Sequence, residues 1–327
     1  MLGSIYGKLA DVRNALYERG VIDRFYLGAR TISVGNITAG GTGKTPLVAY
    51  VAEVLAKRGE KVCILTRGYK RANEKRRVLV SDGEKVLADF REAGDEPVEL
   101  AQKLLGKAIV IADADRVAAA EWAKRKFGIT AFVLDDGFQH RRAKRDVDIV
   151  CIDATDPFGG GKILPAGRLR EPIDNLARAD AVVITRADLV EDISNLKFEI
   201  SELSPDAKVF EAANEFQRSA GNDPKRENLK KQQALAFCGI GNPDNFFESL
   251  NRGDFSIAAT RAFSDHHAYT QADIEQLEKL AHESGAGILL TTGKDAVKLS
   301  DLKFEIPFAV VEIEVRLDDR KAFAAML

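Results

Sequence analysis

A glycine-rich segment that follows an apolar run has the composition of a phosphate-binding loop. Glycines let backbone N–H groups turn inward around phosphate oxygens, the next helix adds the positive end of its dipole, a lysine reaches the outer phosphates, and a threonine ligates magnesium. The expected nucleotide-binding residues are Thr38, Ala39, Gly40, Gly41, Thr42, Gly43, Lys44 and Thr45. Thr38 stands where the usual G-x-x-x-x-G-K-T pattern has its first glycine. The segment predicts a site for a nucleoside triphosphate and Mg²⁺, with Lys44 as a catalytic residue and Thr45 as a metal ligand.

Two acids, Asp135 and Asp136, follow the apolar run at residues 131–134. In P-loop enzymes a buried strand delivers a carboxylate to the metal beside the phosphate loop. Either aspartate is therefore expected to be the second magnesium contact, and the sequence does not choose between them. The alternative is that paired acids merely open a turn before Gly137.

Further candidates lie where other elements begin. Asp95 and Glu96 precede Pro97 at the expected start of a helix, where proline suits the first turn and acids suit the positive end. Ordinary helix capping explains this pattern, but in a phosphotransferase Asp95 is also a candidate base for a hydroxyl acceptor. Arg67 and Arg116 follow apolar runs at the edge where parallel sheets bind ligands. They are candidate phosphate contacts, although either one alone would be an ordinary surface arginine.

His266 lies in a short segment between an apolar run and a helix, next to Asp265 and His267. Adjacent histidines rarely share a metal ion, so no zinc site is expected. An Asp-His pair is a modest catalytic signal, and a hydrogen-bonded structural histidine is an equal alternative.

The elements that must position these residues alternate along the chain. Short apolar runs separated by segments of helical periodicity predict an α/β fold of the P-loop NTPase type, with a parallel sheet covered by helices on both faces. The expected strands are residues 31–34, 61–65, 109–112, 131–134, 148–152 and 181–185. Residues 78–87 resemble a hairpin beside this sheet.

A polar stretch without apolar periodicity divides the sequence. Residues 1–213 are expected to form the P-loop domain, residues 214–233 a linker, and residues 234–327 a second, smaller α/β domain. Strands of the second domain are expected at 234–238, 255–260, 288–292 and 307–315.

Composition excludes several classes of protein. The 327 residues contain 48 Lys and Arg against 50 Asp and Glu, so no basic excess indicates nucleic-acid binding. The cysteines, Cys63, Cys151 and Cys238, are far apart and odd in number, which is typical of buried thiols in a reducing compartment. No signal peptide, membrane-spanning run or obligate protein partner is evident.

The first 28 or so residues are expected to form an amphipathic helix. Leu2, Ile5, Leu9, Val12 and Leu16 recur at spacings of three and four and therefore share one face. Packing against a neighbouring domain is the simpler interpretation, and docking on a membrane surface is the alternative.

Taken together, the motifs resemble the lipid A 4′-kinase family, also called tetraacyldisaccharide 4′-kinases. The segments that carry the resemblance are Gly40 to Pro46, Thr66 to Tyr69, Gly94 to Pro97, Asp113 to Arg116, Asp135 to His140, Leu164 to Pro172, Asp265 with His266, and Lys294 to Lys298. They appear in the family order over nearly the whole chain. The two departures are Thr38 in the phosphate loop and Gly293, where the family usually has glutamate.

The resemblance implies transfer of the ATP γ-phosphate to the 4′-hydroxyl of a tetraacylated glucosamine disaccharide 1-phosphate. It places the enzyme at the cytoplasmic face of a Gram-negative inner membrane and makes the N-terminal helix a membrane or acyl-chain contact. It also implies an Asp95–His266 catalytic dyad, with Glu96 nearer the metal. Substrate contacts are expected from Arg67, Tyr69, Arg116, Arg168 and Arg170, because a guanidinium matches phosphate oxygens.

Two other functions are compatible with parts of the sequence. Residues 185–188, Thr-Arg-Ala-Asp, approach the [N/T]-K-x-D pattern that selects guanine in GTPases and metal-insertion switch proteins, but the lysine is missing and no Cys/His cluster offers a cargo site. A soluble small-molecule kinase on the same fold would use the N-terminal apolar face for packing alone.

Overall fold

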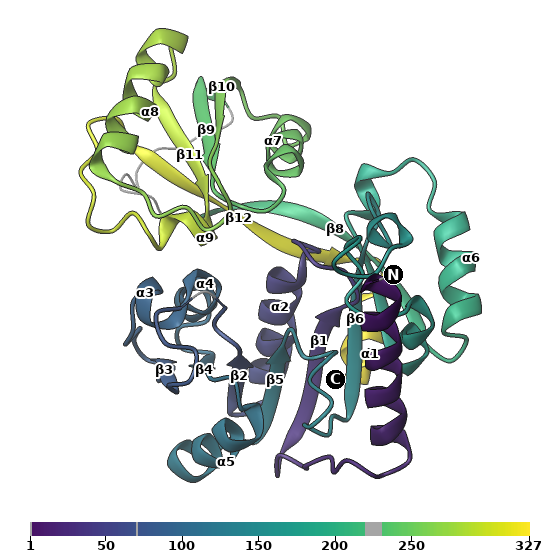
Figure 1. The fold of residues 1–327 in the computed structure, drawn as a ribbon. Coiled ribbons are helices and arrows are strands. Elements are labelled where there is room, and N and C mark those ends of the chain that lie inside the picture. Colours follow the sequence, from purple (N-terminus) through teal and green to yellow (C-terminus); the bar gives the residue numbers. More distant parts are fainter. Residues whose placement is uncertain (1, 70, 220–230) are drawn as a thin grey trace. The chain divides into compact units, whose positions relative to one another are not determined.

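The chain forms two compact units in a computed structural model that describes residues 2–69, 71–219 and 231–327. Unit 1 comprises the chain up to residue 214 together with residues 315–327, and unit 2 comprises residues 215–314. The chain leaves unit 1 within strand β8 (Lys208–Ser219) and returns to it within strand β12 (Phe308–Leu317) (Figure 1).

Unit 1 is built on a mostly parallel sheet with the strand order β8-β7-β6-β1-β5-β2-β4-β3. Neighbouring strands pair in parallel except β3, which is antiparallel to β4. The other strands are β1 (Arg30–Asn36), β2 (Val62–Thr66), β3 (Val78–Ser81), β4 (Ala108–Ala112), β5 (Ala131–Asp135), β6 (Val147–Asp153) and β7 (Ala181–Thr185). All six apolar runs of the first domain form the strands that their composition predicts. The carboxyl ends of β1, β2, β4 and β5 therefore lie at one edge of the sheet.

Helices cover both faces of this sheet, as predicted. Side chains of a strand point alternately to its two faces. Cys63, Leu65, Phe132 and Leu134 pack with the alanines of helix α5 (Arg116–Phe127) on one face. Helix α2 (Lys44–Lys57) contacts β1, β2 and β5 through its own buried apolar residues, which belong to the opposite face. The P-loop NTPase-like architecture is thus confirmed for unit 1.

The helices of unit 1 vary in length from single turns to four or more turns. They are α1 (Leu2–Glu18), α2 (Lys44–Lys57), α3 (Phe90–Ala93), α4 (Asp95–Lys103), α5 (Arg116–Phe127), α6 (Ser194–Leu203) and α10 (Arg320–Met326), with 3-10 turns at Gly159–Gly161, Ile173–Arg178 and Ala187–Leu189. The residues at 78–87 add β3 to the edge of the main sheet, and Ser81 and Val86 form a single bridge next to it.

Unit 2 is a smaller α/β unit whose four strands all pair in parallel in the order β10-β9-β11-β12. Its remaining elements are β9 (Ala234–Cys238), α7 (Pro243–Arg252), β10 (Ile257–Ala262), α8 (Gln271–Ser284), β11 (Ile288–Thr292) and α9 (Gly293–Ala296). Leu235 and Phe237 pack with α8, whereas Ala236 and Cys238 pack with α7. This alternation gives the unit a helix on each face.

The unit boundaries differ from the sequence-based domains at two places. Residues 315–327, assigned to the second domain by sequence, belong to unit 1, where Phe323 is fully buried against Tyr50 and Phe210 with ring centroids 5.9 Å and 5.2 Å away. Residues 214–219 of the expected linker continue strand β8, and residues 220–230 lie outside the described part of the chain.

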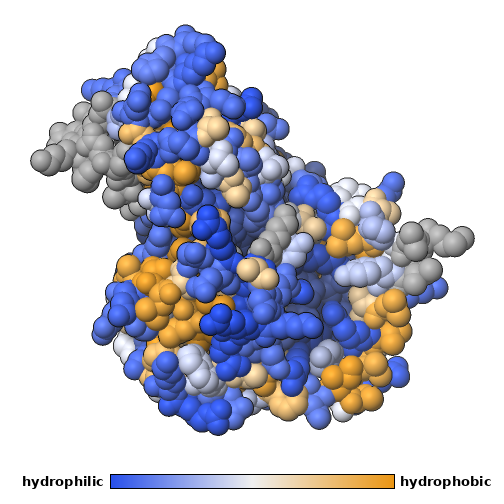
Figure 2. All heavy atoms as spheres, turned by 60° about the vertical axis from the view of Figure 1, so that its left-hand side comes forward, coloured by the Kyte–Doolittle hydropathy of each residue, from blue (hydrophilic) through white to orange (hydrophobic). Residues whose placement is uncertain are grey.

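Hydrophilic side chains make up most of the surface that Figure 2 shows. On the face drawn in Figure 2, hydrophobic side chains form separate patches between charged and polar ones. The three cysteines are buried and unpaired, and burial raises the thiol pKa of each of them, to about 12 for Cys151 and Cys238. These thiols are accordingly protonated and unreactive near neutral pH.

Candidate active site

The phosphate loop connects the end of β1 to the start of α2 (Figure 1). Gly43, directly before α2, has φ 73°, and Gly40 has φ 119°, which are backbone conformations that side chains with a Cβ rarely adopt. Thr38 is not among the residues with positive φ, is 2% exposed and forms an isolated bridge with Leu169. Its departure from the glycine pattern is therefore compatible with the loop.

Side chains from other elements hold the outer side of this loop. Arg168 Nε donates to the carbonyl of Ala39 at 3.0 Å, and Arg186 donates to the carbonyl of Gly41 at 2.9 Å. Thr185 Oγ1 donates to the carbonyl of Thr42 at 2.9 Å. In a trans peptide the carbonyl and the next N–H point in opposite directions. The N–H groups that follow these three carbonyls consequently point away from the supporting side chains, as anion binding requires.

Lys44 and the paired acids meet beside the loop. Lys44 Nζ lies 3.4 Å from Asp136 Oδ1, and Arg170 donates to both oxygens of Asp136 at 2.8 Å and 2.7 Å. Although burial disfavours the charged carboxylate, Lys44 and Arg170 hold the pKa of Asp136 well below its usual range. Asp136 is therefore an ionised partner of two cations at neutral pH.

Asp135 has a different environment from its neighbour. It ends β5, is 5% exposed and accepts a hydrogen bond from Thr66 Oγ1 at 2.8 Å. Burial raises the pKa of this carboxyl to about 6, and the charges of Glu96 and Asp136 add to the increase. Glu96 and Asp135 are therefore close enough to interact electrostatically.

The donor set beside the loop fits Mg²⁺. Thr45 and Asp135 offer hard oxygen ligands, which Mg²⁺ prefers, and Mg²⁺ is usually bound by one or two carboxylates together with water and phosphate oxygens. Within the described residues there is no group of three or more His, Cys, Asp or Glu that could hold a metal by itself. Because Lys44 and Arg170 engage the oxygens of Asp136, Asp135 fits the metal better.

Asp95 and Arg116 begin two successive helices of the sequence, α4 and α5. Asp95 is 6% exposed and its Oδ1 accepts from the N–H of Glu96 at 3.0 Å at the start of α4. Arg116 is also 6% exposed and begins α5. Burial lowers the pKa of Arg116, and the charges of Asp135 and Asp136 oppose that change. Its Nε has no hydrogen-bond partner within the described residues. Arg116 is thus a buried cation with a free donor near the two aspartates.

The other predicted substrate contacts occupy varied positions. Arg67 and Tyr69 are exposed, and Arg67 lies 3.5 Å from Glu74. Arg168 pairs with Asp156 at 2.5 Å while it supports the phosphate loop. Arg170 contacts Asp136, as described above.

His266 belongs to unit 2, whereas Asp95 belongs to unit 1. His266 has φ 63°, and its N–H donates to the carbonyl of Gly239 at 3.0 Å. Its Nε2 lies 3.5 Å from both Asp265 Oδ2 and Lys294 Nζ. The imidazole therefore lies in a polar cluster at the carboxyl ends of β9 and β11.

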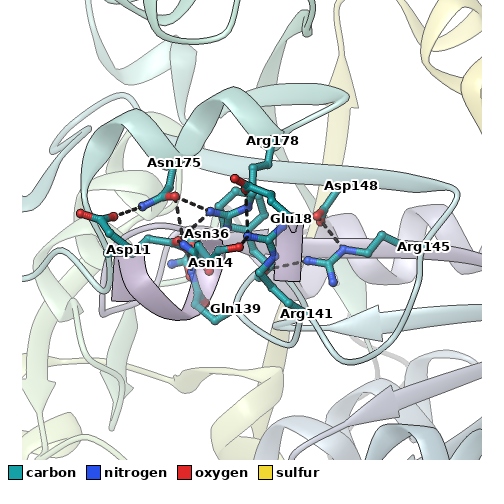
Figure 3. A network of polar contacts seen from close by, with 12 residues as sticks. Asp11, Asn14, Glu18, Asn36, Gln139, Arg141, Arg145, Asp148, Asn175 and Arg178 are labelled. Atoms are coloured by element: carbon teal, nitrogen blue, oxygen red, sulfur yellow. Dashed lines mark hydrogen bonds and ion pairs between the residues drawn. The ribbon is translucent and has the colours of Figure 1, made fainter. Parts of the chain in front are cut away.

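Sequence reasoning missed several residues that support the site. Arg186 and Thr185 were considered only for guanine selection, yet they hold the phosphate loop, and Arg186 also pairs with Asp153. Gln139 and Glu171 lie within segments that carry the family resemblance, but those segments alone indicate no role for either residue. Gln139 belongs to the polar network of Figure 3 and donates to Glu171 at 2.8 Å. The only available signal was their position inside motifs, because their partners are distant in sequence.

A parallel sheet with a phosphate loop, a lysine and a buried aspartate at the end of a neighbouring strand defines a P-loop phosphotransferase. Within that class, the family model for tetraacyldisaccharide-1-P 4′-kinase matches residues 1–327. The chain belongs to the tetraacyldisaccharide 4′-kinase family. It is a kinase that uses ATP, and the GTPase alternative is not favoured.

Relatives of known name and a solved structure match this chain over nearly its whole length. The tetraacyldisaccharide 4′-kinase of Halothermothrix orenii is 39% identical over 97% of this chain and 88% of its own. That of Geobacter metallireducens is 39% identical over 97% of this chain and 92% of its own. The crystal structure of the "apo" form of LpxK from Aquifex aeolicus in complex with ATP aligns with a TM-score of 0.79 and 32% identity, covering 100% of this chain and 98% of that one.

Proposed function

We propose that this kinase transfers the γ-phosphate of ATP to the 4′-hydroxyl of a tetraacylated glucosamine disaccharide 1-phosphate in lipid A biosynthesis. The observation that carries the proposal is that Asp135 interacts electrostatically both with Lys44 of the phosphate loop and with Arg116, in a chain that matches the family over its full length. Phosphoryl transfer depends mainly on positioning and on charge stabilisation, which this cluster provides.

The direct test is transfer of radiolabel from γ-labelled ATP to the lipid disaccharide phosphate. Labelled lipid is expected with ATP and Mg²⁺, and much less product is expected with GTP. A soluble glucosamine derivative without acyl chains serves as the control for a small-molecule kinase. Phosphorylation of the soluble control at the same rate, or hydrolysis without labelled lipid, would contradict the proposal.

Asp135 and Thr45 are proposed as the metal ligands, with Glu96 near the metal. A bound Mg²⁺ neutralises charge on the β- and γ-phosphate oxygens. The chain's own contribution is to hold the phosphates with loop N–H groups, to place Lys44 at the transferred group and to keep Asp136 between Lys44 and Arg170. Arg67, Tyr69, Arg116, Arg168 and Arg170 are retained as proposed substrate contacts.

Asp95 is proposed as the base that accepts the proton of the acceptor hydroxyl, with His266 as its partner. Asp136 is held by two cations and Asp135 fits the metal, whereas Asp95 stands at the start of a helix on the ligand edge of unit 1. The family resemblance supports the pairing with His266 of unit 2. A histidine from another unit would complete the base only when substrate is bound, which protects ATP from water.

Members of one catalytic unit lose activity non-additively when they are removed together. Asp95→Ala and His266→Ala are each expected to lower kcat by about 10²–10³-fold, within the range of general-base catalysis, and the double variant is expected to fall little further. His282→Ala, on the exposed end of α8, is the matched control and should retain full activity. If the losses of the two single variants multiply in the double variant, Asp95 and His266 act independently and are not one catalytic unit.

Helix α1 is proposed as the membrane-contacting element, at the cytoplasmic face of the inner membrane of a Gram-negative bacterium. Within the described residues, six of the ten exposed large hydrophobic residues lie in α1 or just after it: Tyr6, Leu9 and Val12 in the helix, and Val21, Phe25 and Tyr26 in the segment that follows. Leu9 and Val12 are 64% and 57% exposed. No described helix has the length and apolar character to cross a bilayer. An exposed apolar face on one helix favours docking in the plane of the interface.

Leu9→Glu and Val12→Glu are expected to weaken flotation with zwitterionic liposomes and to raise KM for the lipid acceptor more than KM for ATP. A charge on the apolar face is costly to bury among acyl chains. Lys57→Glu introduces the same acidic side chain on an exposed residue of α2, away from the apolar face of α1, and should float like the wild type. If both apolar-face variants float like the wild type, α1 is not the element that contacts the membrane.

A further inference from the structure

A buried carboxylate, Glu171, links the N-terminal helix to the phosphate loop. Its partners Asn14, Gln139 and Arg178 are labelled in Figure 3. Glu171 is 0% exposed, and four donor contacts reach its two oxygens. Oε1 accepts from Gln139 at 2.8 Å and from Arg178 at 3.2 Å, while Oε2 accepts from Asn14 at 3.1 Å and from Arg178 at 2.9 Å. The negative charge of Glu171 is paired with Arg178. Its neutral partners, Gln139 and Asn14, connect it to two other parts of the structure.

In one direction the network reaches the nucleotide site. The two hydrogens of a primary amide can serve two acceptors, and Gln139 Nε2 donates both to Glu171 and to the carbonyl of Asn36 at 2.8 Å. Its Oε1 faces Arg170 at 3.4 Å, the arginine that grips Asp136. Glu171 therefore determines which way the Gln139 amide faces.

Asn36 continues the connection into the phosphate loop itself. It is the last residue of β1 and is fully buried. Its Nδ2 donates to the carbonyl of Thr38 at 2.6 Å and to Thr42 Oγ1 at 2.9 Å. One side chain thus joins Thr38, at the start of the loop, to Thr42 in its middle, and the carbonyl of Asn36 is held by Gln139.

In the other direction the network reaches α1. Asn14 is 3% exposed and uses Nδ2 for both Glu171 and Asn175 Oδ1, the latter at 3.0 Å. The helix approaches its support closely, since a Cβ on Gly7 would lie 2.7 Å from Ile163 Cδ1. The docked face that contains Gly7 and Asn14 is distinct from the exposed face that contains Leu9 and Val12.

We propose that Asn14 and Glu171 are positioning residues for ATP binding, through which docking of α1 sets the geometry of the phosphate loop and of the Arg170–Asp136 pair. Helix α1 then has two separable functions. Its exposed apolar face serves the membrane, and its docked face supports the nucleotide site. The inference needs ATP binding only, so it stands whatever the acceptor is.

The test measures ATP affinity by titration calorimetry on the full chain, with Mg²⁺ and without lipid, detergent or vesicles. Asn14→Ala is expected to weaken ATP binding on the order of tenfold, because the buried Glu171 carboxylate, which orients the Gln139 amide, loses its donor from α1. Arg13→Ala, the exposed neighbour on the same helix, is the matched control and should bind like the wild type. Deletion of residues 1–22 removes both faces of the helix at once and cannot separate them.

A double-variant cycle of Asn14→Ala with Gln139→Ala distinguishes coupling from independent damage. The two side chains have Glu171 as a common partner, so their effects on ATP affinity should be non-additive. Circular dichroism checks that each variant is folded at the assay temperature, and Asn14→Ser replaces Asn14→Ala where the latter is not. Wild-type affinity in the folded Asn14 variant, equal weakening by Arg13→Ala, or fully additive losses would overturn the proposal.

Discussion

Lys44→Ala is expected to lower kcat/KM for ATP by about 10²–10³-fold and to leave the fold intact. In a site from which water is excluded, a preorganised cation that meets the charge developing on the transferred phosphate stabilises the transition state by an amount that corresponds to this factor. The structure explains why the fold should survive. Lys44 lies in the first turn of α2, and its ammonium contacts Asp136, whose other partner Arg170 stays in place when the lysine is removed.

Steady-state kinetics and a thermal melt check both parts of this expectation. Lys57→Ala, in the last turn of the same helix and exposed, is the matched control and should change neither quantity. A Lys44→Ala protein that keeps most of its rate would exclude the lysine from phosphate contact. A variant that loses its cooperative melt would show that the lysine is needed for folding.

Asp135→Asn is expected to remove most activity and yet to raise stability at neutral pH in the absence of nucleotide and metal. The carboxylate is a hard oxygen ligand and an amide is a much weaker one for Mg²⁺. A kcat loss of about 10²-fold or more, with a higher Mg²⁺ requirement, follows from losing a charge-neutralising site. Asp174→Asn, an exposed aspartate of unit 1, is the matched control.

The stability gain has a defined pH dependence. The pKa of Asp135 is raised to about 6 from an ordinary value near 4, so the native state binds more protons than the unfolded state between these values. Wild-type stability should therefore fall as the pH rises through this window, and above pH 6 the charged, buried carboxylate carries its full cost, on the order of 1–3 kcal/mol.

Asp135→Asn carries no such charge, so its advantage in free energy of unfolding should be present at pH 8 and shrink toward pH 4. Denaturant titrations of the metal-free protein across this range measure the difference. If the difference in free energy of unfolding between Asp135→Asn and the wild type is the same at pH 4 and pH 8, ionisation of Asp135 does not destabilise the folded state.

Local sequence patterns predicted the parts of the fold that depend on local chemistry. The apolar runs became β1, β2, β4, β5, β6 and β7, and glycines with a following lysine marked the loop before α2. Strand β8 was missed because its Glu-Ala-Ala-Asn-Glu centre has no apolar run. The return of residues 315–327 to unit 1 depends on tertiary packing of Phe323, which no periodicity reveals.

The residues that support the site were harder to predict than the residues that touch ligand. Lys44, Asp135 and Arg116 belong to recognisable chemical patterns and the structure brings them together at one edge. Asn14 and Glu171 are 157 residues apart, and either one alone looks like an ordinary polar residue. Their pairing follows from the docking of α1, so a single sequence without a fold contains no signal for it.

The path of the chain through the two units has a consequence for synthesis on the ribosome. Nascent chains fold domain by domain from the N-terminus, but here residues 315–327 are made after all of unit 2 and still belong to unit 1. Phe323 fills a fully buried site, and the carbonyl of Met326 accepts from Arg30 at 2.9 Å. Unit 2 can therefore complete its sheet while the kinase unit is still missing α10, and a nascent chain stalled at residue 314 would expose the apolar surface around Tyr50 and Phe210. Unit 1, although its first 214 residues are translated before unit 2, is completed after it.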